Sequence, residues 1–196
     1  MSLYALKPRF QELLRPLARR LYAIGISANQ VTFAACAISV ALGAWLAVSP
    51  AAWPFLLVPA WLALRMAFNA IDGMLAREFG QASRLGAYLN ELCDVISDAA
   101  LYAPFALLPG SSPWLVGAVI LLSALAEMAG VLGAALGGQR RYDGPLGKSD
   151  RALVFGVLGL LAGLGLWPGA PAWIWLTLLA LLGLTVANRI RRGAAQ

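Results

Sequence analysis

The chain has 196 residues, of which 61% are hydrophobic and 12% are charged, and it carries a formal net charge of +6. A soluble domain is nearer half apolar and a quarter charged, so this composition excludes an ordinary soluble protein and indicates an integral membrane protein. The positive charge does not indicate nucleic-acid binding, because the basic residues fall in short clusters at the ends of apolar segments, as in cytoplasmic loops that face anionic lipid.

Residues 3–24 are predicted to form an amphipathic helix that lies in the membrane interface. Leucine and phenylalanine recur at helical spacing from Leu3 to Leu21, and basic residues occupy much of the remaining surface. Pro16 lacks an N–H group and is expected to bend or interrupt this helix. The alternative is a basic lead-in that only sets the topology of the chain.

Six segments are long and apolar enough to cross a bilayer, which takes about 20 residues. We place them at about 28–48, 53–78, 84–108, 113–136, 150–167 and 171–190. The breaks at 49–50, 109–113 and 167–169 contain turn residues and no charge, whereas the opposite ends contain every lysine and arginine except Arg65. This asymmetry places both termini in the cytoplasm.

The sequence therefore predicts an all-α integral membrane protein with six transmembrane helices and an N-terminal interfacial amphipathic helix. It forms one membrane domain over residues 1–196, with the interfacial helix at 3–24 and the six-helix bundle at 28–192. We expect it in a bacterial inner membrane. Two small-xxx-small glycine pairs suit either close helix packing or a homodimer face: Gly133/Gly137 and Gly159/Gly163.

The polar stretch between the second and third spans, residues 69–98, holds five of the nine acidic residues. A short turn near 79–83 makes the two spans an antiparallel pair. At a rise of about 1.5 Å per residue, Asn69 should lie opposite Asp94. The same register places Arg65 opposite a second aspartate one turn deeper, Asp98, and predicts a buried ion pair there.

Four oxygen-bearing side chains converge in this register. Asn69 and Asp72 are three residues apart and share one helix face, and Asn90 and Asp94 are four apart and share another. They should meet roughly 8–12 Å inside the cytoplasmic helix ends. Carboxylate and amide oxygens suit Mg²⁺, Mn²⁺ or Ca²⁺, and charges at this depth are usually functional. The alternative is a polar cluster that only holds the helices together.

The same stretch carries a family resemblance. Its pattern is Asp72-Gly73-x-x-Ala76-Arg77, eight further residues, and then Gly86-x-x-x-Asn90-x-x-x-Asp94. This resembles the signature of the CDP-alcohol phosphotransferase (CDP-alcohol phosphatidyltransferase) family, D-x-x-D-G-x-x-A-R, eight or nine residues, G-x-x-x-D-x-x-x-D. The segment Gly25–Thr32 resembles the usual entry to the family's first span, and the six-span layout is similar.

Two positions depart from that signature, because Asn69 and Asn90 stand where the family has its first and third aspartates. The family's site usually holds two divalent ions, Mg²⁺ or Mn²⁺. An amide can coordinate such an ion but carries one negative charge fewer, so one or two ions are expected here. Glu127, at a depth matching Asp94, is a candidate compensating ligand, or else forms a buried hydrogen bond to a neighbouring helix. Glu91 points about 100° away from Asn90 and is a weaker candidate.

The resemblance implies transfer of a phosphoalcohol group from a CDP-alcohol, in the first place CDP-diacylglycerol, to an acceptor hydroxyl with release of CMP. In this reaction Asp94 would be the general base and also a metal ligand. Asp72 would be the principal metal ligand, assisted by Asn69 and Asn90.

The donor would be bound by the remaining motif residues. Gly73, Ala76 and Gly86 would leave room for the cytidine and phosphates, and Arg77 would hold the pyrophosphate. Lys148 and Arg151, three residues apart at the start of the fifth span, could grip an acceptor phosphate or could only be positive-inside anchors. The acceptor alcohol is not identified by these residues.

Two rival functions stay open. A small transporter would spread polar residues through the whole membrane depth, whereas the outer half of this chain is nearly bare of them. A catalytically silent relative that binds nucleotide or lipid is favoured by Asn69 and Asn90. Release of CMP from CDP-diacylglycerol with Mg²⁺ or Mn²⁺ separates an enzyme from a silent relative.

Overall fold

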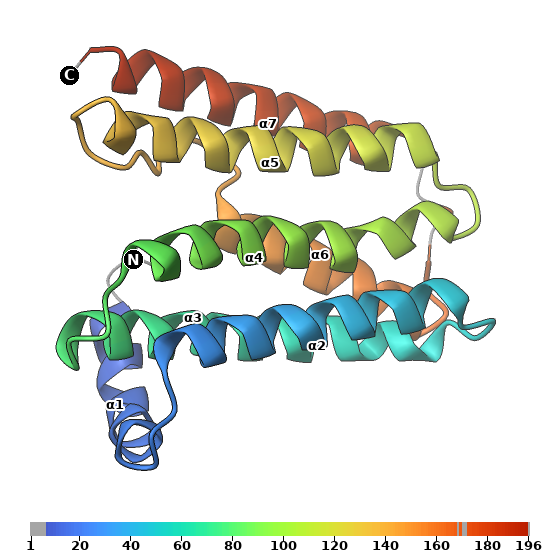
Figure 1. Ribbon diagram of the computed structural model, residues 1–196. Helices are drawn as coiled ribbons and strands as arrows, with labels where there is room; N and C mark the ends of the chain where they lie inside the picture. The colour runs from blue at the N-terminus through green and yellow to red at the C-terminus, as the bar shows by residue number, and fades with distance from the viewer. Residues whose placement is uncertain (1–6, 168, 170–171, 196) are drawn as a thin grey trace.

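The computed structural model describes residues 7–167, 169 and 172–195, and the regular secondary structure in this part of the chain is helical. Figure 1 shows its arrangement. The helices are α1 (Lys7–Ala23), α2 (Ala28–Val48), η2 (Trp53–Leu56), α3 (Leu57–Glu78), α4 (Arg84–Tyr102), η3 (Ala103–Leu107), α5 (Pro113–Ala135), α6 (Lys148–Gly163) and α7 (Ala172–Gly193). The two η elements are short 3₁₀ segments.

Four of these segments are long and apolar enough to cross a membrane: Ala28–Val48, Trp53–Glu78, Pro113–Ala135 and Ala172–Gly193. Helices α4 and α6 run alongside them in Figure 1. Helix α4 contains much of the polar stretch, and α6 has only 16 residues. Six membrane spans therefore remain a prediction.

Several predicted boundaries differ from the observed ones. The third predicted span, 84–108, is α4 followed by η3, because Pro104 lies where the α-helix gives way to the 3₁₀ segment. The fifth begins at Lys148 rather than at 150. Its first turn is closed by Asp150, whose carboxylate accepts the N–H of Gly147 at 2.9 Å. Pro16 does not interrupt α1, and residues 3–6 of the predicted interfacial helix lie outside the described residues.

Helix α1 lies across one end of the bundle, the end that also carries the α3–α4 turn, the α5–α6 loop and the end of α7 (Figure 1). Ala18 of α1 packs against Ile71 and Leu75 of α3, and Arg15 forms a 3.1 Å ion pair with Glu78. Phe10, Leu13 and Leu17 stay exposed on the other side. An exposed apolar face beside basic residues is what an interfacial helix requires.

Glycines let the helices approach closely. A Cβ atom at Gly43 of α2 would lie 2.1 Å from the backbone oxygen of Ala100 in α4. Gly159 and Gly163 of α6 serve the same purpose, because their Cβ atoms would lie 2.8 Å from Val58 and 2.6 Å from Leu56. This glycine pair therefore packs within the chain, as small residues do in membrane bundles. A homodimer remains a prediction.

Replacement of Gly43 tests the α2–α4 contact. Gly43→Ala is expected to destabilise the fold by about 1–3 kcal/mol, because the added methyl group meets backbone and not a flexible side chain. Thermal unfolding in detergent, followed by tryptophan fluorescence, measures the loss. Gly117→Ala is the matched control, since Gly117 is an exposed helical glycine with no neighbouring atom within 4 Å of the added Cβ. Equal midpoints for the two variants would contradict the close approach.

Candidate active site

The first element of the site is Asp72, a carboxylate on α3 that is only 5% exposed. Thr32 of α2 donates a hydrogen bond from Oγ1 to Oδ2 of Asp72 at 2.7 Å. Sequence reasoning did not single out Thr32. The available signal was its place one turn inside the first span, which puts a hydroxyl at nearly the same depth as Asp72.

Asp72 differs from its acidic neighbours in its partners. Among the described residues, no arginine or lysine lies within ion-pair distance of Asp72. Each of the other acids in this part of the bundle has at least one such partner: Glu91, Asp94, Asp98 and Glu127. A buried carboxylate without a cation is costly, so this position suits a bound cation.

Asp94 on α4 lies at the centre of a set of hydrogen-bond donors. The Nδ2 group of Asn69 donates to Oδ1 of Asp94 at 3.3 Å, which confirms the predicted register of α3 and α4. Arg65 donates to the same oxygen at 3.3 Å and to the Asp94 backbone oxygen at 3.0 Å. The ammonium of Lys148, the first residue of α6, forms an ion pair with Oδ2. The carboxylate is therefore held from three sides.

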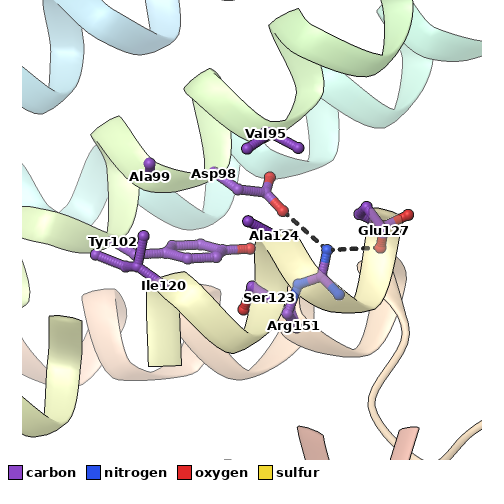
Figure 2. Close-up of a pocket in the computed structure, with 9 residues that line it drawn as sticks. All are labelled: Val95, Asp98, Ala99, Tyr102, Ile120, Ser123, Ala124, Glu127 and Arg151. Carbon is purple, nitrogen blue, oxygen red and sulfur yellow. Dashed lines mark hydrogen bonds and ion pairs between the residues drawn. The ribbon is translucent and has the colours of Figure 1, made fainter. Parts of the chain in front are cut away.

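One turn deeper, the predicted pair of Arg65 and Asp98 is confirmed, with Nη1 and Oδ1 separated by 2.5 Å. Arg151 of α6 extends the pair. Figure 2 shows its guanidinium between two carboxylates, with Nη2 at 3.1 Å from Oδ2 of Asp98 and 2.9 Å from Oε1 of Glu127. Asp98 is thus bound by two arginines, Arg65 and Arg151.

Glu127 of α5 lies among arginines. Besides Arg151, it pairs with Arg140 at 3.4 Å and with Arg189 of α7 at 3.5 Å. The described residues contain no group of three His, Cys, Asp or Glu side chains placed to share a metal ion. Glu127 therefore does not join Asp72 and Asp94. The arrangement favours its alternative role as a buried polar link between helices.

Arg151, like Glu127, is enclosed by protein groups. It is 1% exposed, and it borders a cavity of about 10 Å³ that is lined also by Tyr102 and Ser123 (Figure 2). Such a cavity has room for about one water molecule. In this structure the Arg151 guanidinium is bound by Asp98 and Glu127, and a role in holding an acceptor phosphate stays a prediction. Lys148 is the more accessible member of the predicted pair, and it contacts Asp94.

The remaining motif residues are only partly brought together. The amide of Asn90 donates to Glu91 at 3.4 Å, and Glu91 is in turn paired with Arg140. No hydrogen bond joins Asn90 to Asn69, Asp72 or Asp94 within the described part of the chain. Asn69 and Asp94 are thus in contact through the amide nitrogen of Asn69, whereas Asp72 and Asn90 have other partners, and the convergence of all four oxygens on one ion stays a prediction.

The small residues of the motif lie beside polar groups. A Cβ at Gly73 would be 2.6 Å from Nη2 of Arg77, so the guanidinium folds back over that glycine, next to Asp72. A Cβ at Gly86 would be 2.8 Å from Oδ1 of Asn29. Ala76 differs, because it packs against the α1–α2–α3 apolar cluster. Gly73 and Gly86 thus leave room for polar side chains near the α3–α4 turn, whereas Ala76 supports the docking of α1.

Comparisons with known proteins agree with the family resemblance of the motif on α3 and α4. A family model described as CDP-alcohol phosphatidyltransferase matches residues 25–186. The chain is 47% identical over 194 residues to inner membrane protein YnbA of Escherichia coli, covering 97% of this chain and 96% of that protein. It is 30% identical over 162 residues to the archaetidylinositol phosphate synthase of Aeropyrum pernix, covering 80% of each.

Crystal structures of the phosphatidylinositol phosphate synthase of Mycobacterium tuberculosis have a similar fold at 22% sequence identity. The complex with manganese and citrate has a TM-score of 0.67 and covers 91% of this chain and 87% of that chain. The structure with CDP-DAG bound has a TM-score of 0.66 and covers 90% and 89%. From the family match over residues 25–186 and the identity to full-length relatives, the chain belongs to the CDP-alcohol phosphatidyltransferase family and is a CDP-alcohol phosphotransferase.

Proposed function

We propose that this chain transfers the phosphatidyl group of CDP-diacylglycerol to the hydroxyl group of an acceptor alcohol and releases CMP. Family membership supports the class of reaction. The choice of donor is supported by the mycobacterial structure of similar fold, which has CDP-DAG bound. The Aeropyrum relative is an archaetidylinositol phosphate synthase, so a lipid product is also consistent with this choice.

The observation that carries the proposal is the contrast between Asp72 and Asp94. Asp72 is buried and has no ion-pair partner among the residues that the structure describes, whereas Asp94 is oriented by three donors. The surroundings of Asp72 fit a residue that holds a divalent ion. The surroundings of Asp94 fit a residue that must be accurately positioned to react. Asn69, which donates to Asp94, shares a face of α3 with Asp72.

In the proposed mechanism, Asp72 would hold Mg²⁺ or Mn²⁺, with amide oxygens of Asn69 and Asn90 as further ligands after side-chain adjustment. When bound, the ion would neutralise and orient the donor pyrophosphate. Arg77, whose guanidinium already lies over Gly73, would contact the same phosphates. Asp94 would accept the proton of the acceptor hydroxyl as that oxygen attacks the phosphorus, and the phosphorus–oxygen bond to CMP would break.

The membrane arrangement is part of the proposal. Residues 1–196 would form one membrane domain with six spans, and α1 would lie in the interface. Both termini and the active site would face the cytoplasm, because the basic residues gather at the end of the bundle where Asp72 and Asp94 lie. A bacterial inner membrane is supported by the name of the Escherichia coli relative. The donor would reach the site from the surrounding lipid.

The direct test is incubation of the purified chain with CDP-diacylglycerol, Mn²⁺ and a panel of alcohols in liposomes. Release of CMP and the mass of the new lipid are measured together. We expect CMP release that needs both the divalent ion and one class of alcohol, and that stops when the ion is chelated. Binding of the donor with no CMP release for any alcohol would favour a catalytically silent relative instead.

A further inference from the structure

Four arginines near the site are paired with Asp98 or Glu127. Arg65 and Arg151 bind Asp98, and Arg140 and Arg189 bind Glu127. Lys148 differs from these arginines, because its side chain is 31% exposed and, among the described residues, its ammonium forms an ion pair with Asp94 only. A flexible, accessible cation therefore touches the carboxylate that is expected to act in the reaction.

These contacts use most of the hydrogen-bond acceptor positions of the Asp94 carboxylate. A carboxylate offers about four acceptor positions. Arg65 and Asn69 use Oδ1, and Lys148 uses Oδ2. A divalent ion that bound Asp94 would have to displace the Lys148 ammonium or lie against it, and two positive charges at that separation repel each other. One acceptor position of Asp94 stays available, which is enough for a proton.

Asp72 has the opposite surroundings. Its Oδ2 accepts the hydroxyl of Thr32, and no protein cation in the described part of the chain pairs with it. Asn69 and Asn90, the further ligands proposed above, carry no negative charge. The site thus contains one carboxylate that needs a cation, Asp72, and one that is already paired with a cation, Asp94.

We propose that Lys148 is a built-in cation of this site: its ammonium takes the place of a divalent ion at Asp94, so that the chain binds one divalent ion, at Asp72. This inference rests on the metal-dependent function proposed above. It also gives Lys148 a role other than binding an acceptor phosphate, because the ammonium stabilises the orientation in which Asp94 faces the acceptor hydroxyl.

Manganese binding tests the inference without relying on turnover. The full chain is reconstituted in phosphatidylcholine nanodiscs with CDP present, and free Mn²⁺ is followed by electron paramagnetic resonance during titration. We expect one Mn²⁺ per wild-type chain and at least tenfold weaker binding for Asp72→Asn. Lys148→Met should bind a second Mn²⁺ or bind the first about tenfold more tightly, because a repelling charge is removed.

Two control variants make the titration specific. Lys148→Arg keeps a cation at Asp94 and should retain one Mn²⁺ per chain. Arg191→Met removes an exposed cation of the last turn of α7 and should leave the titration unchanged. Two Mn²⁺ ions on the wild type, or an unchanged titration for Lys148→Met, would overturn the role of Lys148.

The outcomes separate this inference from the proposed activity. A wild-type chain that binds two Mn²⁺ ions and releases CMP refutes the inference and leaves the activity standing. A chain that binds one Mn²⁺ ion, responds to Lys148→Met as described and yet releases no CMP supports the inference and refutes the activity. Binding of no Mn²⁺ at all would overturn both.

Discussion

Asp94→Asn is expected to lower the rate of CMP release by roughly 10²–10⁴-fold, the usual contribution of a general base. The side-chain amide has nearly the same shape and can still accept hydrogen bonds from Arg65 and Asn69, but it cannot take the acceptor proton. The fold should survive, because Arg65 keeps its shorter contact with Asp98. The initial rate of CMP release and the thermal midpoint are measured on the same preparation.

Asp143→Asn is the matched control for that substitution. Asp143 lies in the α5–α6 loop, where Arg141 and Arg192 bind its carboxylate at 2.8 and 2.5 Å. The same chemical change outside the site should leave the rate within a few-fold of the wild type. An Asp94→Asn chain with undiminished turnover would show that another group accepts the proton.

Glu127→Ala is expected to cost about 3–5 kcal/mol of stability, the effect of leaving buried charges without their partner. Arg151, Arg140 and Arg189 all bind this carboxylate, and Arg151 and Arg189 are almost fully buried. Thermal unfolding in detergent should show a large drop in the midpoint. Glu12→Ala, at an exposed position of α1, is the control and should change the midpoint little.

The same variant decides between the two roles considered for Glu127. If it only links helices, Glu127→Ala should bind Mn²⁺ as the wild type does at temperatures where the variant remains folded. Loss of Mn²⁺ binding with an unchanged thermal midpoint would show instead that Glu127 is a metal ligand. The structure favours the first result, because Glu127 is surrounded by arginines and is separated from Asp72.

The ion pairs that include Asp94 also contribute to the stability of the bundle. Arg65 touches both Asp94 and Asp98, and Arg151 joins Asp98 to Glu127, so four helices contribute to one set of pairs. Removal of any one partner leaves a charge in an apolar setting. We therefore expect substitutions at Asp98, Glu127 and Arg151 to reduce turnover mainly through loss of folded protein, and substitutions at Asp72 and Asp94 to reduce it in the folded state.

Features that depend on neighbouring residues could be predicted from the sequence. The lengths of the apolar segments predicted the helices over 28–48 and 53–78, and the short α3–α4 turn set the register that pairs Asn69 with Asp94 and Arg65 with Asp98. Both results follow from helix geometry alone, because an antiparallel pair joined by a few residues has little freedom to slide. The family motif lies wholly within this pair.

Contacts between helices far apart in the chain were decided only by the tertiary structure. Thr32 meets Asp72 across 40 residues, Lys148 meets Asp94 from the start of α6, and Glu127 meets arginines before, on and after α6. Periodicity predicts that a helix has a polar face, but it does not say which other helix that face will meet. That choice depends on how the whole bundle packs, and the close approach of α2 to α4 at Gly43 is one of its causes.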